Sequence, residues 1–195
     1  MRLRRFMLML KPFIIDHDDS FTYILATYFP NAVVLNHKKC SVAEVEALNP
    51  THLILSPGPG NPENPDDFAI GHELISAFEK RIPILGVCLG HQGIAAHYDA
   101  RITHAPTPKH GRKSQITHNE RGLFSDLPSP FEVMRYHSLQ VEKLPEILEI
   151  TAKSDDGLIM AFKHRELPIF GVQFHPESFK TEYGEKVIEN FLGLV

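Results

Sequence analysis

A cysteine flanked by two glycines is the first feature of the sequence that could carry out chemistry. In the segment GVCLGHQ, residues 86–92, Cys88 has a glycine two positions away on each side. The segment follows an apolar run and leads into a helical pattern. A sharp turn from strand to helix projects its middle residue outward, and flanking glycines let neighbouring backbone come close. The start of a helix also favours a thiolate. The pattern predicts a nucleophilic cysteine, and the alternative is a buried cysteine in a tight turn.

A thiolate nucleophile needs a base, and one of the twelve histidines stands out for that role. In QFHPES, residues 173–178, His175 directly follows an apolar run and Glu177 comes two residues later. Residues i and i+2 of an extended segment point to the same side, and Pro176 disfavours a helix at His175. A carboxylate beside an imidazole holds its tautomer and stabilises the imidazolium. We therefore expect Cys88, His175 and Glu177 to act as nucleophile, base and orienting group.

A glycine-rich loop, SPGPGNP at residues 56–62, follows another apolar run. Without side chains in the way, such a loop can aim backbone N–H groups at a developing oxyanion. The alternative is a turn that is merely stiffened by its prolines. Because the active sites of open α/β sheets lie at the carboxyl ends of the strands, we expect all three segments to meet at one sheet edge.

Strand and helix patterns alternate through the first hundred residues, and the predicted strands are continuously apolar. The predicted strands cover residues 12–16, 32–36, 52–56 and 82–87. The predicted helices cover residues 19–29, with Asp19 or Ser20 as N-cap, 41–48, 68–80 and 90–98. Further on, we expect a hairpin turning at Asp156-Gly157, a strand over 167–174 and a closing amphipathic helix over 181–195.

This alternation predicts an α/β fold. We expect an open, mostly parallel twisted sheet of the flavodoxin-like kind, with helices on both faces and a small antiparallel addition. The 195 residues, 43% of them hydrophobic, are enough for one buried core, so residues 1–195 are expected to form a single domain.

The bulk composition excludes several classes of protein. A formal net charge of −4 does not favour nucleic-acid binding. Two cysteines far apart predict reduced thiols and a cytoplasmic protein. The N-terminal MRLRRFMLML has too short an apolar run for a signal peptide, and no stretch is long enough to span a membrane. The histidines are irregularly spaced, without Cys-x-x-Cys or His-Glu-x-x-His, so no metal site is expected.

Together, GVCLGHQ, SPGPGNP and VQFHPES resemble the class I (triad-type) glutamine amidotransferases. The segments IDHDDSFTY, MRYHSL and HPESFKTEYG are similar to the amidotransferase component of anthranilate synthase and of aminodeoxychorismate (para-aminobenzoate) synthase. The resemblance covers essentially the whole chain. It implies that Cys88 attacks the γ-amide carbon of L-glutamine to give a glutamyl thioester, while His175 transfers protons and Glu177 orients it.

The resemblance also implies a set of substrate-binding residues: Gly58, Pro59, Gly60, Leu89, Gln92, Ser138 and Leu139. In this family the backbone N–H groups of Gly58 and Leu89 would form the oxyanion hole. Gln92 and the Ser138-Leu139 segment would hold the α-amino and α-carboxylate ends of the substrate. No cofactor is implied for this chain. The implied partner is a separate chorismate-binding synthase subunit, which would use the ammonia for tryptophan or folate biosynthesis.

The chain departs from the family pattern at three places. His17 and Asp18 replace the usual Asn and aromatic residue, Asp99-Ala100 replaces a Gly-Gly pair, and the usual HGK turn reads HGRK at residues 110–113. We expect the first and third departures to affect the surface that docks to the partner, with Arg112-Lys113 as a basic turn. Two alternatives to the proposed role are a catalytically silent binding module on the same scaffold and an amidotransferase subunit that serves another acceptor.

Overall fold

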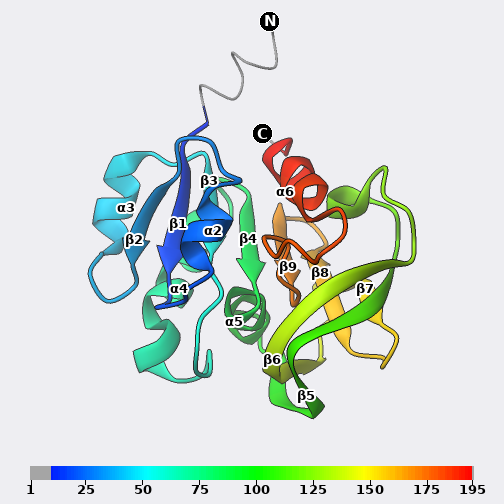
Figure 1. Cartoon of the computed structure of the whole chain (residues 1–195). Coiled ribbons are helices and arrows are strands. Elements are labelled where there is room, and N and C mark those ends of the chain that lie inside the picture. The colour runs from blue at the N-terminus through cyan, green and yellow to red at the C-terminus, as the bar shows by residue number, and fades with distance from the viewer. Residues whose placement is uncertain (1–9, 195) are drawn as a thin grey trace, which may run out of the picture.

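The computed structural model describes residues 10–194, apart from the side chain of Ala69, and its strands form one nine-stranded sheet (Figure 1). The strand order is β2-β1-β3-β4-β9-β8-β7-β5-β6. Residues 1–9, which hold most of the stretch considered above as a signal peptide, and Val195, the last residue of the expected closing helix, lie outside the described residues.

Five strands form the parallel half of the sheet. They are β1 (Pro12–Asp16), β2 (Val33–Asn36), β3 (His52–Leu55), β4 (Ile84–Val87) and β9 (Ile169–Val172). Every residue of β3, β4 and β9 is buried, as expected of strands covered on both faces. The register pairs Val87 with Val172, so the carboxyl ends of β4 and β9 lie side by side.

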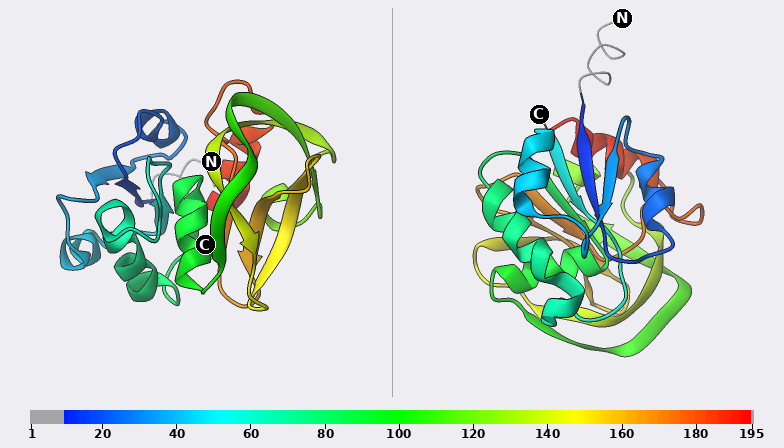
Figure 2. Two further views of the ribbon diagram at one scale, coloured as in Figure 1. Left: turned by 90° about the horizontal axis from the view of Figure 1, so that it is seen from below. Right: turned by 90° about the vertical axis from the view of Figure 1, so that its left-hand side faces the viewer.

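Helices cover both faces of this half (Figure 2). Helices α2 (Thr22–Ala26) and α6 (Gly184–Leu192) pack on one face, in a core that includes Ile14, Ile54 and Leu85. Helices α3 (Val42–Leu48), α4 (Pro65–Phe78) and α5 (Leu89–His97) pack on the other, in a second core built on alternate residues of the same strands. The longest, α4, has 14 residues, and no helix within residues 10–194 has the length and hydropathy to cross a membrane.

Local side-chain hydrogen bonds decide where several helices begin. Ser41 and Glu44 form a complete capping box at the start of α3, so Ser41, the first residue of the predicted range, is the N-cap. Asn64 caps α4, so this helix begins at Pro65, three residues before the expected start. The expected N-cap of α2 is wrong. The carboxylate of Asp19 accepts a hydrogen bond from the backbone N–H of Phe21 at 2.7 Å, and this local turn delays the helix to Thr22.

The antiparallel half of the sheet is larger than the small addition we expect from sequence. It contains β5 (Arg101–His118), β6 (Phe131–Lys143), β7 (Leu148–Ser154) and β8 (Ile159–His164), and a short 3₁₀ turn, η1 (Gly122–Phe124), follows β5. The predicted hairpin between β7 and β8 is confirmed. Strands β5 and β6 are long and lie beside α5, where the sequence pattern predicts no strands. The α/β fold class is confirmed, with four of nine strands in this half.

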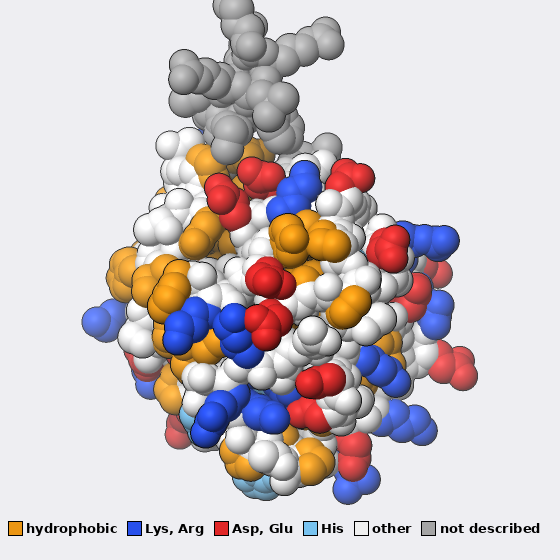
Figure 3. Space-filling view, turned by 45° about the vertical axis from the view of Figure 1, so that its right-hand side comes forward, with side chains coloured by type: hydrophobic (Ala, Val, Ile, Leu, Met, Phe, Trp, Pro, Cys, Tyr) orange, Lys and Arg blue, Asp and Glu red, His pale blue; other side chains and the backbone are white. Residues whose placement is uncertain are grey.

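The surface on this side of the molecule carries mixed charge. Figure 3, which brings this side forward, shows basic and acidic side chains interspersed, with hydrophobic areas between them. Three ion pairs join residues in or next to neighbouring strands of the antiparallel half: Lys113 with Glu132, Lys163 with Glu149 and Arg165 with Glu149.

Candidate active site

Cys88 lies in a strained turn between β4 and α5. Its φ is +52° and its ψ is −99°, in a region that non-glycine residues rarely adopt. Its backbone N–H donates to the carbonyl of Val172 at 2.9 Å, which ties the turn to β9. A Cβ on Gly86 would collide with the carbonyl of Gly90, and a Cβ on Gly90 would collide with the carbonyl of Leu55. The two glycines therefore let α5 begin directly against the sheet, which forces the turn at Cys88.

His175 and Glu177 form a buried pair beyond the end of β9. The Nδ1 atom of His175 lies 2.6 Å from Oε1 of Glu177, and each residue is 2% exposed. The rings of Phe21 and Tyr136 stand edge-on to the imidazole, with centroids 5.3 and 5.1 Å away. The Nε2 atom of His175 has no hydrogen-bond partner among the described residues. The pair thus leaves one ring nitrogen free for a reacting group.

The surroundings of His175 favour its protonated form. Burial lowers the pKa of His175, but the neighbouring Cys88 sulfur and the Glu177 carboxylate raise it more, so the pKa lies well above its usual range. Because Oε2 of Glu177 is buried and has no hydrogen-bond partner within residues 10–194, the imidazolium is the group that offsets the carboxylate charge. A protonated His175 next to Cys88 is the arrangement that stabilises a thiolate.

A small cavity of about 150 Å³ opens beside Cys88. Its lining residues are Gly58, Pro59, Gly60, Cys88, Leu89, Gln92, His110, Tyr136, His137, Ser138 and Leu139. The structure therefore brings all seven predicted substrate-binding residues to one cavity with the predicted nucleophile. Within residues 10–194, no group of three or more His, Cys, Asp or Glu side chains is placed to hold a metal ion.

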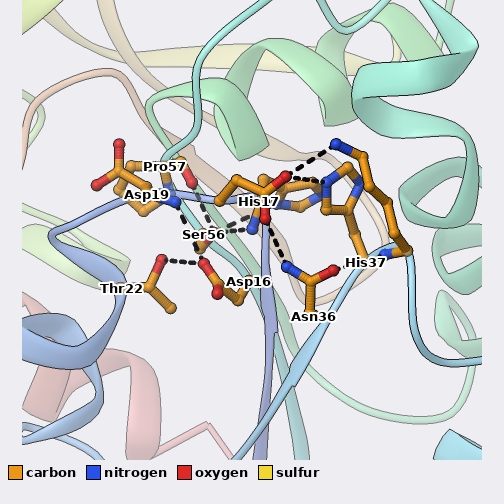
Figure 4. Close-up of polar contacts among 10 residues, drawn as sticks. Asp16, His17, Asp19, Thr22, Asn36, His37, Ser56 and Pro57 are labelled. Carbon is orange, nitrogen blue, oxygen red and sulfur yellow. Dashed lines mark hydrogen bonds and ion pairs between the residues drawn. The ribbon is translucent and has the colours of Figure 1, made fainter.

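The glycine-rich loop of the cavity is held from beneath by Ser56 and His17 (Figure 4). Ser56 Oγ donates to the carbonyl of Pro57 at 2.6 Å and accepts from the backbone N–H of His17 at 3.0 Å. Because the serine has only one hydrogen, Nδ1 of His17, 3.3 Å away, is the donor in the third contact. A Cβ on Gly58 would come within 2.6 Å of His17 Cβ, so the loop packs directly on this residue.

His17 does not belong to a docking surface, contrary to the expectation from sequence. It is 1% exposed and its ring stacks on Phe68 with a centroid distance of 4.8 Å. Burial lowers the pKa of His17 to about 3, so the ring is neutral at neutral pH. The neighbouring Asp18 is partly exposed and accepts hydrogen bonds from the side chains of Asn36, His37 and Lys38. This departure from the family pattern thus ties the end of β1 to the segment after β2.

The other two departures lie on β5 or just before it. Arg112 and Lys113 are strand residues rather than a turn, because β5 continues through them with an irregular register at Gly111. The expectation of a basic turn is therefore wrong, and Lys113 pairs with Glu132 across the hairpin at 2.6 Å. Asp99, two residues after the end of α5, has a positive φ of 62° and does not line the cavity.

Sequence reasoning missed Gln173, which connects the two sides of the cavity. Its side chain is fully buried, and its amide nitrogen donates to Sγ of Cys88 at 3.7 Å. Its Oε1 accepts from Nε2 of Gln92 at 2.9 Å, and the same Gln92 nitrogen donates to the carbonyl of Leu139 at 3.1 Å. The alternation that places His175 and Glu177 on one side would also have indicated Gln173, two residues before the histidine.

Comparison with known proteins matches this chain to one family. A model of the family described as glutamine amidotransferase class-I matches residues 13–194. The anthranilate synthase component 2 of Azospirillum brasilense is 48% identical over 186 residues, which cover 92% of this chain and 93% of the relative. The aminodeoxychorismate synthase of Streptomyces griseus is 46% identical over 193 residues, which cover 95% of this chain and 26% of the relative.

Some relatives are much longer than this chain. The chain spans 32% of the length of the bifunctional protein TrpGD of Thermotoga maritima, with which it shares 47% identity over 189 residues. Among solved structures, a Thermoplasma acidophilum protein whose name describes it as part of a GMP synthase has a TM-score of 0.85 and 29% identity. That match covers 95% of this chain and 93% of the other.

Proposed function

This chain belongs to the class-I glutamine amidotransferases, and from that premise we propose that it is the glutaminase subunit of a two-subunit synthase that uses chorismate. In this role it hydrolyses L-glutamine and passes the ammonia to the synthase subunit. The observation that carries the proposal is a cavity lined by Cys88 and the glycine-rich loop, with the buried His175–Glu177 pair close enough to Cys88 for its sulfur to raise the pKa of His175. The acceptor synthase makes anthranilate, aminodeoxychorismate or both.

The proposed reaction begins with attack of the Cys88 thiolate on the γ-amide carbon of glutamine. The negative charge that develops on the amide oxygen is met by the backbone N–H groups of Gly58 and Leu89. The Nε2–H of His175 then protonates the departing nitrogen, and ammonia leaves a glutamyl thioester. Water attacks the thioester and gives a proton to His175, so glutamate is released and the thiolate is restored. Glu177 holds the imidazole and stabilises its charged form.

Recognition of the amino-acid end of glutamine is assigned to Gln92, Ser138 and Leu139. The amide nitrogen of Gln92 already donates to Gln173 and to the Leu139 carbonyl, which uses both of its hydrogens. The Oε1 atom of Gln92 is therefore the group that remains to accept a hydrogen bond from an α-ammonium group. A cavity of about 150 Å³ with these polar groups suits a single amino acid.

Exposed apolar side chains near the site support a protein partner. Tyr23 and Ile24, on α2, are 67% and 47% exposed, and Phe179, four residues after His175, is 89% exposed. Phe21, the residue just before α2, lies edge-on to the His175 ring at a centroid distance of 5.3 Å, so the α2 part of this surface adjoins the site. Large apolar side chains exposed next to a site from which ammonia must pass are typical of a docking surface.

The test uses the purified chain and the two kinds of synthase subunit separately. We expect each cognate synthase to form product from glutamine and chorismate only when this chain is added, and to form it from ammonium salts without the chain. If the chain binds a synthase but glutamine is never hydrolysed, it is a silent binding module. If glutamine is hydrolysed but neither synthase is supplied with ammonia, the acceptor is a different enzyme.

A further inference from the structure

A fully buried arginine on β6 serves none of the steps above. Arg135 is 0% exposed, and its Nη1 donates to Ser114 Oγ at 3.0 Å and to the Asp156 carboxylate at 2.9 and 3.0 Å. Its Nε donates to Nε2 of His137 at 3.0 Å. Burying a charge is costly unless it is paired and hydrogen-bonded. The Asp156 carboxylate offsets the charge of Arg135, and the hydrogen bond to His137 is not needed for this. That hydrogen bond connects the arginine to a residue of the cavity wall.

The arginine fixes the tautomer of His137. A guanidinium group only donates hydrogen bonds, so Nε2 of His137 is the acceptor and its proton is on Nδ1. That Nδ1–H donates to the carbonyl of Leu139 at 2.7 Å. Burial is the main cause that lowers the pKa of His137 to about 4, and the positive charge of Arg135 acts in the same direction, so the ring remains neutral at neutral pH. The direction of both hydrogen bonds is thereby set.

The Leu139 carbonyl receives a second donor from a helix that covers the parallel half of the sheet. Nε2 of Gln92, on α5, reaches the same oxygen at 3.1 Å. Two donors on one carbonyl fix the orientation of the peptide group that follows Leu139. His137, Ser138 and Leu139 line the cavity, so the buried arginine acts on the cavity wall without lining it.

We propose that Arg135 is a positioning residue for glutamine recognition. Acting through His137, it orients the Leu139 carbonyl and with it the wall that receives the α-amino and α-carboxylate ends of the substrate. The inference rests on the proposed function and deepens it. Arg135 takes no part in the reaction itself. Its loss should therefore weaken recognition of the amino-acid end of glutamine and leave the reactivity of Cys88 unchanged.

Two alkylating reagents distinguish these effects on the full chain. Iodoacetamide needs only the thiolate, whereas the chloroketone analogue of L-glutamine also needs its α-amino and α-carboxylate groups to be held. Both form a bond from Sγ of Cys88 to carbon and displace a halide. We expect Arg135→Gln to lower the chloroketone rate constant by about tenfold or more, the effect of losing one or two polar contacts, and to leave the iodoacetamide rate nearly unchanged. The KM for glutamine should rise more than kcat falls.

Asp156→Asn is the matched control, because it weakens the ion pair and leaves the bond from Arg135 to His137. The asparagine keeps an oxygen that accepts from Nη1 of Arg135, so the variant should lower the stability of the fold, because the arginine charge loses its carboxylate, but change neither labelling rate of the folded protein by more than about threefold. If Arg135→Gln does not fold, two variants of His137 provide the same test. His137→Asn keeps an N–H near the position of Nδ1, whereas His137→Leu removes it, so the asparagine variant should retain most of the chloroketone rate that the leucine variant loses.

Equal losses with both reagents in Arg135→Gln or His137→Leu would overturn the inference, because they would indicate a general structural role. No loss with either reagent would also overturn it. A wild-type chain that reacts with iodoacetamide but not with the chloroketone would instead overturn the proposed function, and this inference with it.

Discussion

The two halves of the sheet contribute different parts of the site. The parallel half carries Cys88, the His175–Glu177 pair and the glycine-rich loop after β3, all at the carboxyl ends of its strands. The antiparallel half carries residues 136–139 of β6, which line the cavity. In the mechanism proposed above, the first half holds the reacting atoms and the second half holds the end of the substrate that does not react.

The halves also fix their parts by different means. In the parallel half, backbone contacts place the nucleophile: Cys88 N–H to the Val172 carbonyl, and the close approach of α5 to β3 at Gly90. In the antiparallel half, buried side chains do it, through Arg135 and His137. Substitutions in the first half should therefore lower turnover, whereas substitutions in the second should mainly raise the KM for glutamine.

The largest effect should follow removal of the nucleophile from the parallel half. Cys88→Ser should abolish glutamine-dependent synthesis, because a hydroxyl is far less ionised than a thiol and no stronger base is present. Synthesis from ammonium salts by the partner should be unchanged. Cys40→Ser is the control, since Cys40 lies outside the cavity lining. Product assays with glutamine and with ammonia check both, and a Cys88→Ser complex that retained most of its glutaminase activity would refute the assignment.

The next largest effect should come from the base. His175→Ala should lower glutaminase turnover by about 10²–10⁴, the usual range for loss of a general acid–base group. Glu177→Gln should lower it less, because the imidazole remains and only its orientation and charge are weakened. Steady-state turnover measures both. Normal turnover in His175→Ala would exclude the triad, and a loss in Glu177→Gln as large as that in His175→Ala would give the carboxylate a further role.

The same pair predicts a pH dependence of stability with a definite sign. Because the pKa of His175 is raised in the folded protein, its interactions stabilise the fold fully below the unfolded value of about 6.5. That stabilisation is lost as the pH rises through the folded pKa. Glu177→Gln should therefore destabilise the protein more at pH 6 than at high pH. Urea unfolding of both proteins across this range measures the difference, and a deficit that grew with pH would contradict it.

The parallel half was also the half that the sequence predicted well. Each of its strands is a short apolar run, and helix starts such as Ser41 are local signals. Cys88 and His175 each follow a parallel strand, and the carboxyl ends of parallel strands lie at one edge of the sheet. In the structure these two strands, β4 and β9, are also neighbours.

The antiparallel half could not be predicted in the same way. Strand β5 contains Pro106, Pro108 and Gly111, and its register with β6 shifts around these residues, so its pattern is not that of a regular strand. Its strand conformation depends on pairing with β6, which is a tertiary effect. The role of Arg135 and His137 could not be predicted for the same reason. Only the pairing of β5 with β6 buries the arginine and brings it into hydrogen-bond contact with the histidine.

A smaller effect is expected from the partner. The loop Gly58-Pro59-Gly60 has few side chains to hold it, and misplacing one oxyanion donor costs about 10²–10³ in turnover. We expect the isolated chain to hydrolyse glutamine slowly and the synthase subunit, more so with chorismate bound, to raise the rate by at least about tenfold, with about 10³ as the upper limit. A steady-state glutaminase assay with and without the synthase tests this, and equal rates would indicate a constitutive glutaminase.

Substitutions at two exposed apolar residues test where the synthase subunit docks. Phe179→Ala should reduce the activation by the synthase while the basal rate stays unchanged, because Phe179, four residues after His175, is 89% exposed and absent from the cavity lining. Ile147→Ala, an exposed apolar residue between β6 and β7, should leave the activation unchanged. Equal activation of the Phe179 variant and the wild type would place the docking surface elsewhere.

The smallest effect concerns the support of the oxyanion loop from within the parallel half. Ser56→Ala removes the hydroxyl that joins His17 to the Pro57 carbonyl, so the loop loses part of its anchor and turnover should fall by about threefold to tenfold, equivalent to roughly 1 kcal/mol. Ser41→Ala is the matched control: it removes the cap of α3, costs about 1 kcal/mol of stability and should leave turnover unchanged. Urea unfolding and steady-state kinetics on both variants separate the two effects. Equal turnover in both variants would mean that packing of Gly58 against His17 and Leu89 holds the loop, and that the parallel half positions it without the serine hydrogen bonds.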